Sequence, residues 1–296
     1  MTRSTGCGWV CATVLLAAPL AAQNDAEVEV SPVAEGVWLL TGRGGNVGVA
    51  AGEEAVFLVD DQYAPLTEPI RDAIGELGFG DVDFVLNTHW HGDHTGGNEN
   101  LGRAGALIVA HRNVRERMGS DQFIEALDLA VEASPPGALP VVTFTNDVTF
   151  HINGQDIEAF HVPAAHTDGD ALVVFRGANV IHMGDTFFAG RYPFIDVSSG
   201  GSIDGVIAAV EAGMALADEE TRIIPGHGPL STVADLEAYR DVLVAVRQNV
   251  AAMIEEGMGE EDVVAAGPSA DWDETWGAGF VDPEAFVRSV YVSLTR

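Results

Sequence analysis

The stretch Thr88-His89-Trp90-His91-Gly92-Asp93-His94 constrains this chain more than any other part of it. Three histidines and a carboxylate within six residues are costly to bury unless a cation gathers them. The apolar run Phe84-Val85-Leu86 predicts a buried strand, so the cluster begins where a strand ends. His89 and His91 point the same way in an extended segment because strand side chains alternate, and one metal ion can therefore meet both. Asp93 and His94 lie beyond the strand end, where a turn can direct them towards a second ion.

The pattern His89-x-His91-x-Asp93-His94 resembles the signature of the metallo-β-lactamase superfamily. The resemblance implies an α/β protein with the αββα sandwich fold, in which two mixed sheets are flanked by helices and the metals lie at one edge of the sheets. It covers roughly residues 33–240, and we expect a single catalytic domain over residues 23–296.

Strand and helix patterns alternate along the chain, as expected for an α/β protein. Strands are predicted within residues 28–60 and at residues 84–86, 106–110, 141–144, 148–152, 157–161, 171–175, 180–181 and 223–224. Helices are predicted at residues 66–78, 112–129 and 232–256, with a last short one starting at Asp282-Pro283. Asn153-Gly154 predicts a hairpin turn between two of the strands.

Three later motifs match the family's order of metal ligands. His166-Thr167 follows a predicted strand, Gly184-Asp185 ends another, and Gly226-His227-Gly228 lies in a Gly/Pro turn. The resemblance implies that each ion has three ligands of its own and that one carboxylate bridges the two ions. The first ion would take His89, His91 and His166, the second Asp93, His94 and His227, with Asp185 bridging.

Other polar residues receive more local interpretations. The resemblance implies that Asp60 orients the ligand loop by hydrogen bonding, and Asp61 is the near alternative for this role. The other interpretation is that the two aspartates form a solvated turn. Asp170 either orients a ligand or closes a turn. Arg191 either binds a substrate carboxylate or is a surface or packing arginine. Two histidines outside the ligand pattern, His111 and His182, are interpreted as structural.

The implied cofactor is Zn²⁺, two ions per chain, because nitrogen and oxygen ligands favour zinc, although they also accept iron or manganese. Two cations about 3.5–4 Å apart lower the pKa of a shared water, so that hydroxide is available to attack a carbonyl group. Asp93 is the expected catalytic residue, orienting this nucleophile and relaying its proton.

The substrate class stays open because one fold hosts many chemistries. The first hypothesis is an exported dinuclear zinc hydrolase that opens β-lactam rings or related cyclic amides. The alternative is a thioesterase or lactonase of the glyoxalase-II-like branch, because Asp185 resembles the bridging aspartate of that branch. An iron oxidoreductase and a non-catalytic metal-binding module are the candidates from other classes.

Charge and the first residues bear on partners and location. The formal net charge is −31 and all 14 basic residues are arginines, so nucleic acid and anionic membranes are excluded as partners and a small-molecule substrate is expected. Residues 1–22 match a secretory signal peptide, with cleavage expected after Ala22. Both cysteines, Cys7 and Cys11, lie in that segment, so the mature chain has no cysteine. A periplasmic or secreted enzyme without membrane attachment is therefore expected, and its oligomeric state stays open.

Overall fold

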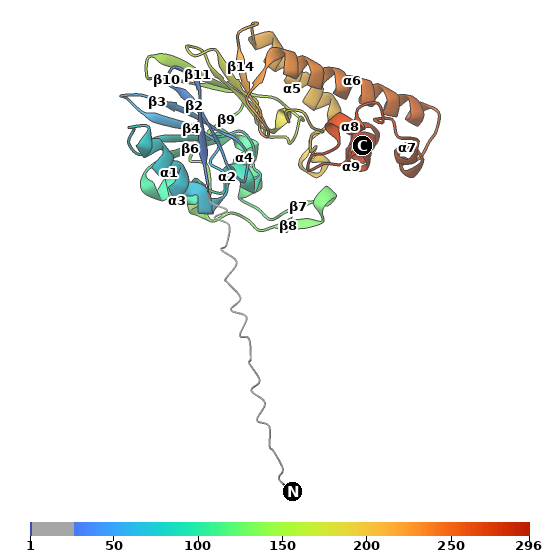
Figure 1. The fold of residues 1–296 in the computed structure, drawn as a ribbon, viewed down its shortest axis with the longest axis horizontal. Helices are drawn as coiled ribbons and strands as arrows, with labels where there is room; N and C mark the ends of the chain where they lie inside the picture. The colour runs from blue at the N-terminus through green and yellow to red at the C-terminus, as the bar shows by residue number, and fades with distance from the viewer. Residues whose placement is uncertain (2–26) are drawn as a thin grey trace.

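Two mixed sheets pack face to face in the computed structural model, which describes Met1 and residues 27–296 (Figure 1). The first sheet has seven strands in the order β1-β2-β3-β4-β5-β6-β9, and the second has six in the order β10-β11-β12-β13-β14-β15. The strands of the first sheet are β1 Glu29–Ala34, β2 Val37–Thr41, β3 Val47–Ala51, β4 Val56–Val59, β5 Phe84–Asn87, β6 Leu107–His111 and β9 Val142–Phe144. Those of the second are β10 Asp147–Ile152, β11 Gln155–His161, β12 Ala171–Phe175, β13 Val180–His182, β14 Arg222–Ile224 and β15 Ser231–Thr232.

Helices cover the outer faces of both sheets. The α-helices are α1 Thr67–Glu76, α2 Gly92–Thr95, α3 Asn98–Ala104, α4 Arg112–Met118, α5 Ile203–Leu216, α6 Val233–Glu255, α7 Glu260–Ala266, α8 Asp273–Trp276 and α9 Pro283–Thr295. The single-turn 3₁₀ helices are η1 Ala64–Leu66, η2 Glu125–Leu127, η3 Pro136–Ala138, η4 Gly184–Thr186 and η5 Val197–Ser199. In Figure 1, α1 and α3 lie beside the first sheet and α5, α6 and α9 beside the second. The predicted αββα sandwich is therefore confirmed.

Apolar side chains fill the space between the sheets and beneath each helix layer. Phe57, Val59 and Leu86 of the first sheet pack with Val173 and Phe175 of the second in one fully buried cluster. Burial of such side chains contributes about 1.5–3 kcal/mol each relative to exposure. This packing fixes the sheets against each other, and the strand ends at one edge therefore hold the site in a rigid frame.

Local signals place several elements as predicted. The Asn153-Gly154 turn joins β10 to β11, and both residues have positive φ, as a two-residue hairpin turn requires. Thr232 and Asp235 form a capping box at the start of α6. Asp282 caps α9, and Pro283 occupies its first turn.

The predicted helix over residues 112–129 is wrong beyond its first half. Helix α4 ends at Met118, and Gly119 follows as its C-cap. The segment then forms a separate two-stranded ribbon, β7 Gln122–Ile124 and β8 Leu129–Val131, in which Asp128 adopts a left-handed φ of 49°. Ile124 and Leu127 are three residues apart, so the segment also fits a helical period, and the tight turn at Asp128 decides for the ribbon.

The predicted signal peptide and both cysteines lie outside the described residues, apart from Met1. No helix of the described residues has the length and apolarity that a membrane span requires.

Candidate metal centre

The ligand loop leaves the carboxyl end of β5 and is clamped by buried polar groups. Asp60, at the end of β4, accepts hydrogen bonds from the Thr88 backbone N–H and hydroxyl, both at 2.7 Å. The same carboxylate lies 2.8 Å from Nδ1 of His94. Asp61 is also buried rather than solvated, and it accepts a hydrogen bond from the Gly97 backbone N–H at 2.9 Å. The two aspartates therefore fix both ends of the loop.

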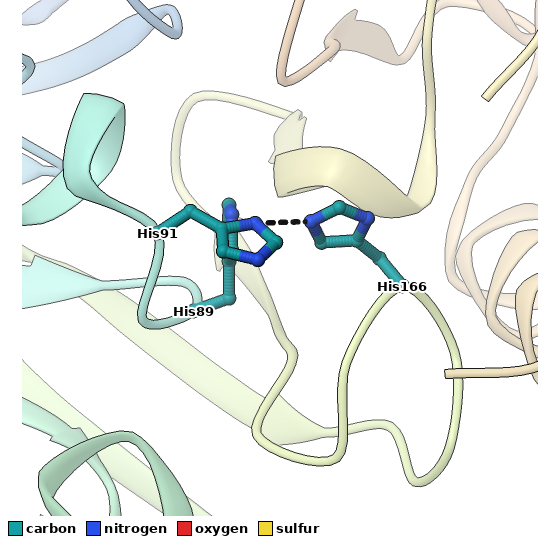
Figure 2. Close-up of side chains that lie close together, drawn as sticks. All are labelled: His89, His91 and His166. Carbon is teal, nitrogen blue, oxygen red and sulfur yellow. Dashed lines mark hydrogen bonds between the residues drawn. The ribbon is translucent and has the colours of Figure 1, made fainter. Parts of the chain in front are cut away.

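Three histidines converge at the first position. His89 and His91 come from the loop after β5, and His166 comes from the turn after β11 (Figure 2). Nε2 of His166 lies 2.8 Å from Nδ1 of His91, and all three rings are buried. One nitrogen from each ring lies within 4.8 Å of the others, which makes the trio a candidate metal site.

A second group lies beside the first. Oδ2 of Asp93 is 3.5 Å from Nε2 of His94 and 3.3 Å from Nε2 of His227. Glycine backbones press against this group: a Cβ at Gly45 would lie 2.1 Å from Cε1 of His94. A larger residue at position 45 would therefore displace the His94 ring.

Asp185 lies between the two groups. Its Oδ1 is 3.1 Å from Nε2 of His94, and its Oδ2 is 3.4 Å from Nε2 of His227. Oδ2 also lies 3.7 Å from Nε2 of His166 and 3.9 Å from Nε2 of His89. A Cβ at Gly226 would lie 2.0 Å from Oδ1, so glycine is required there for the close approach. The structure thus brings all seven predicted ligand residues together.

Unpartnered buried atoms test whether divalent metal ions fit this cluster. Nε2 of His89, Nε2 of His94 and Oδ1 of Asp185 are buried and have no hydrogen-bond partner within the described residues. Leaving a buried polar atom unpaired costs about 1–3 kcal/mol, so a missing partner is indicated at each. Ligand atoms that share one tetrahedral zinc lie about 3.3 Å apart at normal bond lengths. The individual distances given above, 2.8–3.9 Å, bracket that value, and the ligand atoms of each group all lie within 4.8 Å of one another, so the donor set fits.

The outer nitrogen of four histidines is held by a partner, which leaves the other nitrogen free to face the centre. Nδ1 of His166 donates to the Phe194 carbonyl at 2.7 Å. Nδ1 of His89 lies 3.1 Å from the Thr88 hydroxyl, and Nε2 of His91 lies 3.0 Å from Oδ2 of Asp196. Asp60 holds His94 as described above. Such partners fix the tautomer and orientation of metal-binding histidines.

Among these partners of the histidines, Asp196 is the one that the sequence did not indicate. Its carboxylate is buried and also accepts hydrogen bonds from the Ser199 backbone N–H and hydroxyl. In sequence, Asp196 before two serines looks like an ordinary cap of a short helix, and it does cap η5. Only its distance from His91 identifies a second role.

We predict that Asp196→Asn weakens zinc affinity by about 10–100-fold, the usual effect of losing a ligand's outer partner. The amide cannot supply the negative charge that supports the His91 ring. Zinc affinity is measured by competition with a chromogenic chelator. Asp72→Asn, an exposed change of equal charge on α1, is the control and should have no effect. Equal affinities in all three proteins would contradict the assignment.

Electrostatics favour cations at the second group. Burial lowers the pKa of His227, but the carboxylates of Asp185 and Asp93 outweigh it and raise that pKa to about 9. The pKa of His94 is likewise raised, because Asp185, Asp93 and Asp60 outweigh burial. Burial raises the pKa of Asp93, but His94 and His227 outweigh it and bring that pKa to about 2. Without metal, protons on the two histidines therefore balance the carboxylates.

Zinc uptake at pH 7 should accordingly release about two protons, because a histidine must be neutral to ligate. A raised histidine pKa means a proton that metal must displace, so the apparent zinc affinity should rise as pH increases from 7 to 9. Titration calorimetry in buffers of different ionisation enthalpy measures the release. Uptake without proton release would contradict this charge assignment.

The remaining predicted residues are placed as follows. Asp170 accepts hydrogen bonds from the Thr167 backbone N–H at 2.8 Å and hydroxyl at 2.6 Å, so it closes the turn that carries His166. His111 caps α4, and His182 accepts from the Gly184 N–H at 3.1 Å, so both have structural contacts. Arg191 lines the cavity beside the cluster and makes no ion pair within residues 27–296.

The acidic aromatic loop at residues 271–276 supports the segment that carries Arg191. The Tyr192 hydroxyl donates to Oδ1 of Asp273 at 2.8 Å, and the Tyr192 backbone N–H donates to the Trp276 carbonyl at 3.0 Å. The loop therefore positions one wall of the cavity.

Comparison with known sequences decides the family. The family model described as "Metallo-beta-lactamase superfamily" matches residues 40–244, a span that contains all seven residues of the cluster. This chain belongs to the metallo-beta-lactamase superfamily. As a superfamily member it is a metallo-hydrolase by family, and the clusters described above are able to hold metal.

The individual relatives carry two different descriptions. A hydroxyacylglutathione hydrolase of Erythrobacter litoralis is 31% identical over 107 residues, which cover 35% of this chain and 36% of the relative. A similar hydrolase from Polaromonas sp. matches over 47% of its length, so the chain spans about half or less of these relatives. A metallo-beta-lactamase type 2 of Bacteroides fragilis is 23% identical over 66% of this chain and 76% of its own.

Solved structures share the fold of this superfamily member. A metallo-beta-lactamase from Pontibacter korlensis aligns with a TM-score of 0.60 at 21% identity, covering 74% of this chain and 99% of the other. The DIM-1 metallo-beta-lactamase aligns with the same TM-score at 20% identity, covering 74% of this chain and 97% of the other.

Proposed function

We propose that this chain is a dinuclear zinc hydrolase that cleaves the carbonyl–heteroatom bond of a small acyl substrate. The observation that carries the proposal is the convergence of five histidines and two aspartates. Three of their buried inward atoms, on His89, His94 and Asp185, lack partners among the described residues. His89, His91 and His166 would hold one ion, Asp93, His94 and His227 the other, and Asp185 would contact both. Gathering seven polar side chains at one place is costly, which argues against a non-catalytic metal-binding module.

Two bound divalent ions supply Lewis-acid polarisation of the substrate carbonyl and an acidified water. The chain's own residues supply position and proton transfer. Asp93 and His227 are the accessible members of the cluster, with side chains 22% and 24% exposed, and both line the cavity. The Asp93 carboxylate is therefore placed to orient a water in the cavity and to accept its proton. Asp185, 6% exposed, lies deeper and holds His94 and His227 in place.

A thioester or ester is the bond type that the bridging residue favours. A carboxylate, Asp185, occupies the position between the two groups, as in the glyoxalase-II-like branch that it resembles, and no cysteine occurs after residue 11. The hydroxyacylglutathione hydrolases among the relatives agree with this choice.

β-Lactam opening is the second candidate. It is favoured by the similarity to the Bacteroides fragilis metallo-beta-lactamase, which extends over two-thirds of this chain. The Arg191 guanidinium on the cavity wall would then bind the carboxylate of the substrate.

The test is hydrolysis by the purified, zinc-loaded protein of three substrates side by side: a thioester, a lactone and a chromogenic cephalosporin. Turnover that chelator removes and zinc restores supports the proposal, and the preferred substrate decides between the candidates. Hydrolysis that iron alone restores would keep the hydrolase activity and replace zinc by iron as the working metal. Silence towards all three acyl substrates in a fully zinc-loaded protein would reject the proposed activity.

We also propose export, on the signal-peptide pattern of residues 1–22. Expression of the full chain in a bacterium, followed by N-terminal sequencing of the periplasmic fraction, tests it. The expected mature end is Gln23, and retention of the full chain in the cytoplasm would contradict it.

A further inference from the structure

A cavity of about 510 Å³ opens directly onto the metal centre. Asp93, Asp185 and His227 lie in its wall at the end nearest the cluster. The opposite wall is formed by the β7–β8 ribbon, which Figure 1 shows extending from the region of α4 towards the C-terminal helices. A ligand that fills this cavity therefore lies between the ribbon and the metal-binding cluster.

The ribbon presents one apolar face to this cavity. Ile124, Leu129 and Val131 line it, whereas Phe123 and Ala130 do not, as expected where side chains alternate along paired strands. Leu129 is 46% exposed, so the fold does not bury it. Among the strands of the described residues, β7 and β8 pair only with each other, and the ribbon has no sheet to cover this face.

Contacts at both ends hold the ribbon in place over the cavity. At its base, the Arg117 guanidinium donates to Oε1 of Gln122 at 3.0 Å. At its tip, the Glu125 backbone N–H donates to the Ser198 hydroxyl at 3.2 Å, and the Glu125 carboxylate pairs with Arg296. An isolated two-stranded ribbon is marginally stable on its own, so these contacts keep the apolar face directed at the cavity.

Aromatic side chains form much of the facing wall. Trp90, Phe188 and Phe194 line the cavity near the cluster, and Phe280 lies further out, with its ring centroid 6.2 Å from that of Phe194. Phe280 is 72% exposed, the largest exposed fraction of any large apolar side chain in residues 27–296. Two apolar walls therefore face each other across a space that leads to the metal ligands.

We infer that the substrate carries an extended apolar group, which lies between the β7–β8 ribbon and Phe280 while its carbonyl group faces Asp93, Asp185 and His227. The inference rests on the proposed function, since it names the substrate class of that site. The class is an acyl compound that carries an alkyl chain or an aromatic group. Arg43, Arg117 and Arg191 also line the cavity, so the two walls select for the apolar group and leave the charge of the rest of the substrate open.

The experiment measures binding apart from catalysis. Straight-chain 2-alkanones from butanone to nonanone, which no hydrolase cleaves, are titrated calorimetrically into metal-free and zinc-loaded protein. We expect the affinity to rise about fourfold per methylene until the cavity is filled. In parallel, kcat/KM is measured for p-nitrophenyl esters from acetate to octanoate.

Variants on both walls locate the effect. Leu129→Asn and Phe280→Ser change exposed side chains, so the fold is retained, and each should reduce the gain per methylene to about twofold. Phe123→Asn is the matched control, because Phe123 is 51% exposed on the other face of the same ribbon, and it should leave the gain unchanged. Bound zinc should be equal in all four proteins.

The two proposals fail in different ways. A chain-length gain in alkanone binding that both wall variants weaken supports the inference, even if no ester is cleaved and the proposed function falls. Affinities independent of chain length, or an equal loss in Phe123→Asn, overturn it, even if the esters are hydrolysed and the proposed function stands.

Discussion

Asp93→Ala is expected to lower kcat of the zinc-loaded protein by about 10²–10⁴-fold, the contribution of a positioned proton acceptor. The Asp93 carboxylate lines the cavity and lies 3.3 Å from Nε2 of His227 and 3.5 Å from Nε2 of His94. Its backbone carbonyl, which the substitution keeps, accepts the hydrogen bond from the Gly45 N–H. The fold should therefore survive, with loss confined to catalysis and to the second ion.

The readouts are kcat on the best acyl substrate over a range of zinc concentrations, zinc content and thermal unfolding. Asp72→Ala on α1, an exposed position, controls for loss of one negative charge. Wild-type-like turnover by Asp93→Ala at any zinc concentration would refute the role assigned to this carboxylate.

Asp185→Asn should have the larger effect on metal uptake, more than about 100-fold in affinity, beyond the range seen for outer partners of ligands. Among the carboxylates of residues 27–296, only that of Asp185 lies within 4 Å of histidines from both groups. Its charge also raises the pKa of His227 and His94, so the variant should release fewer protons when zinc binds. Asparagine keeps the volume and avoids a cavity at this buried position.

Calorimetric zinc titration of Asp185→Asn measures affinity, stoichiometry and proton release together. The Asp196→Asn protein is a useful comparison, because it also loses one buried carboxylate of the site. Unlike Asp185, the Asp196 carboxylate contacts a single histidine. If Asp185→Asn binds two ions as tightly as the wild type, a bridging position for Asp185 is wrong.

The ligand cluster was predictable from sequence because its motifs resemble those of a known family and occur in the same order, and most of its residues lie at strand ends. His89 and His91 follow β5, Asp185 follows β13 and His227 follows β14, and strand ends are marked by apolar runs that stop at glycine or polar residues. Once those strands belong to a sandwich, their ends meet at one edge. The same resemblance indicated Asp60, which directly follows β4.

Features set by tertiary distance were not predictable. Asp196 lies in a segment without strand or helix periodicity. The histidine that it contacts is 105 positions away in the sequence. The β7–β8 ribbon has three-residue strands, too short for a pattern of period two to outweigh the helical spacing of Ile124 and Leu127. The shared metal cluster was therefore more accessible to sequence reasoning than substrate choice.

The most direct test of the account is the number of zinc ions bound per chain, measured by elemental analysis after equilibrium dialysis of the wild type, His89→Ala and His227→Ala. His89 belongs to the first group and His227 to the second, so the two variants separate the proposed sites. We expect two ions in the wild type and about one tightly bound ion in each variant. A wild type that binds no zinc or a single ion, or variants that bind two ions as tightly as the wild type, would contradict the dinuclear centre.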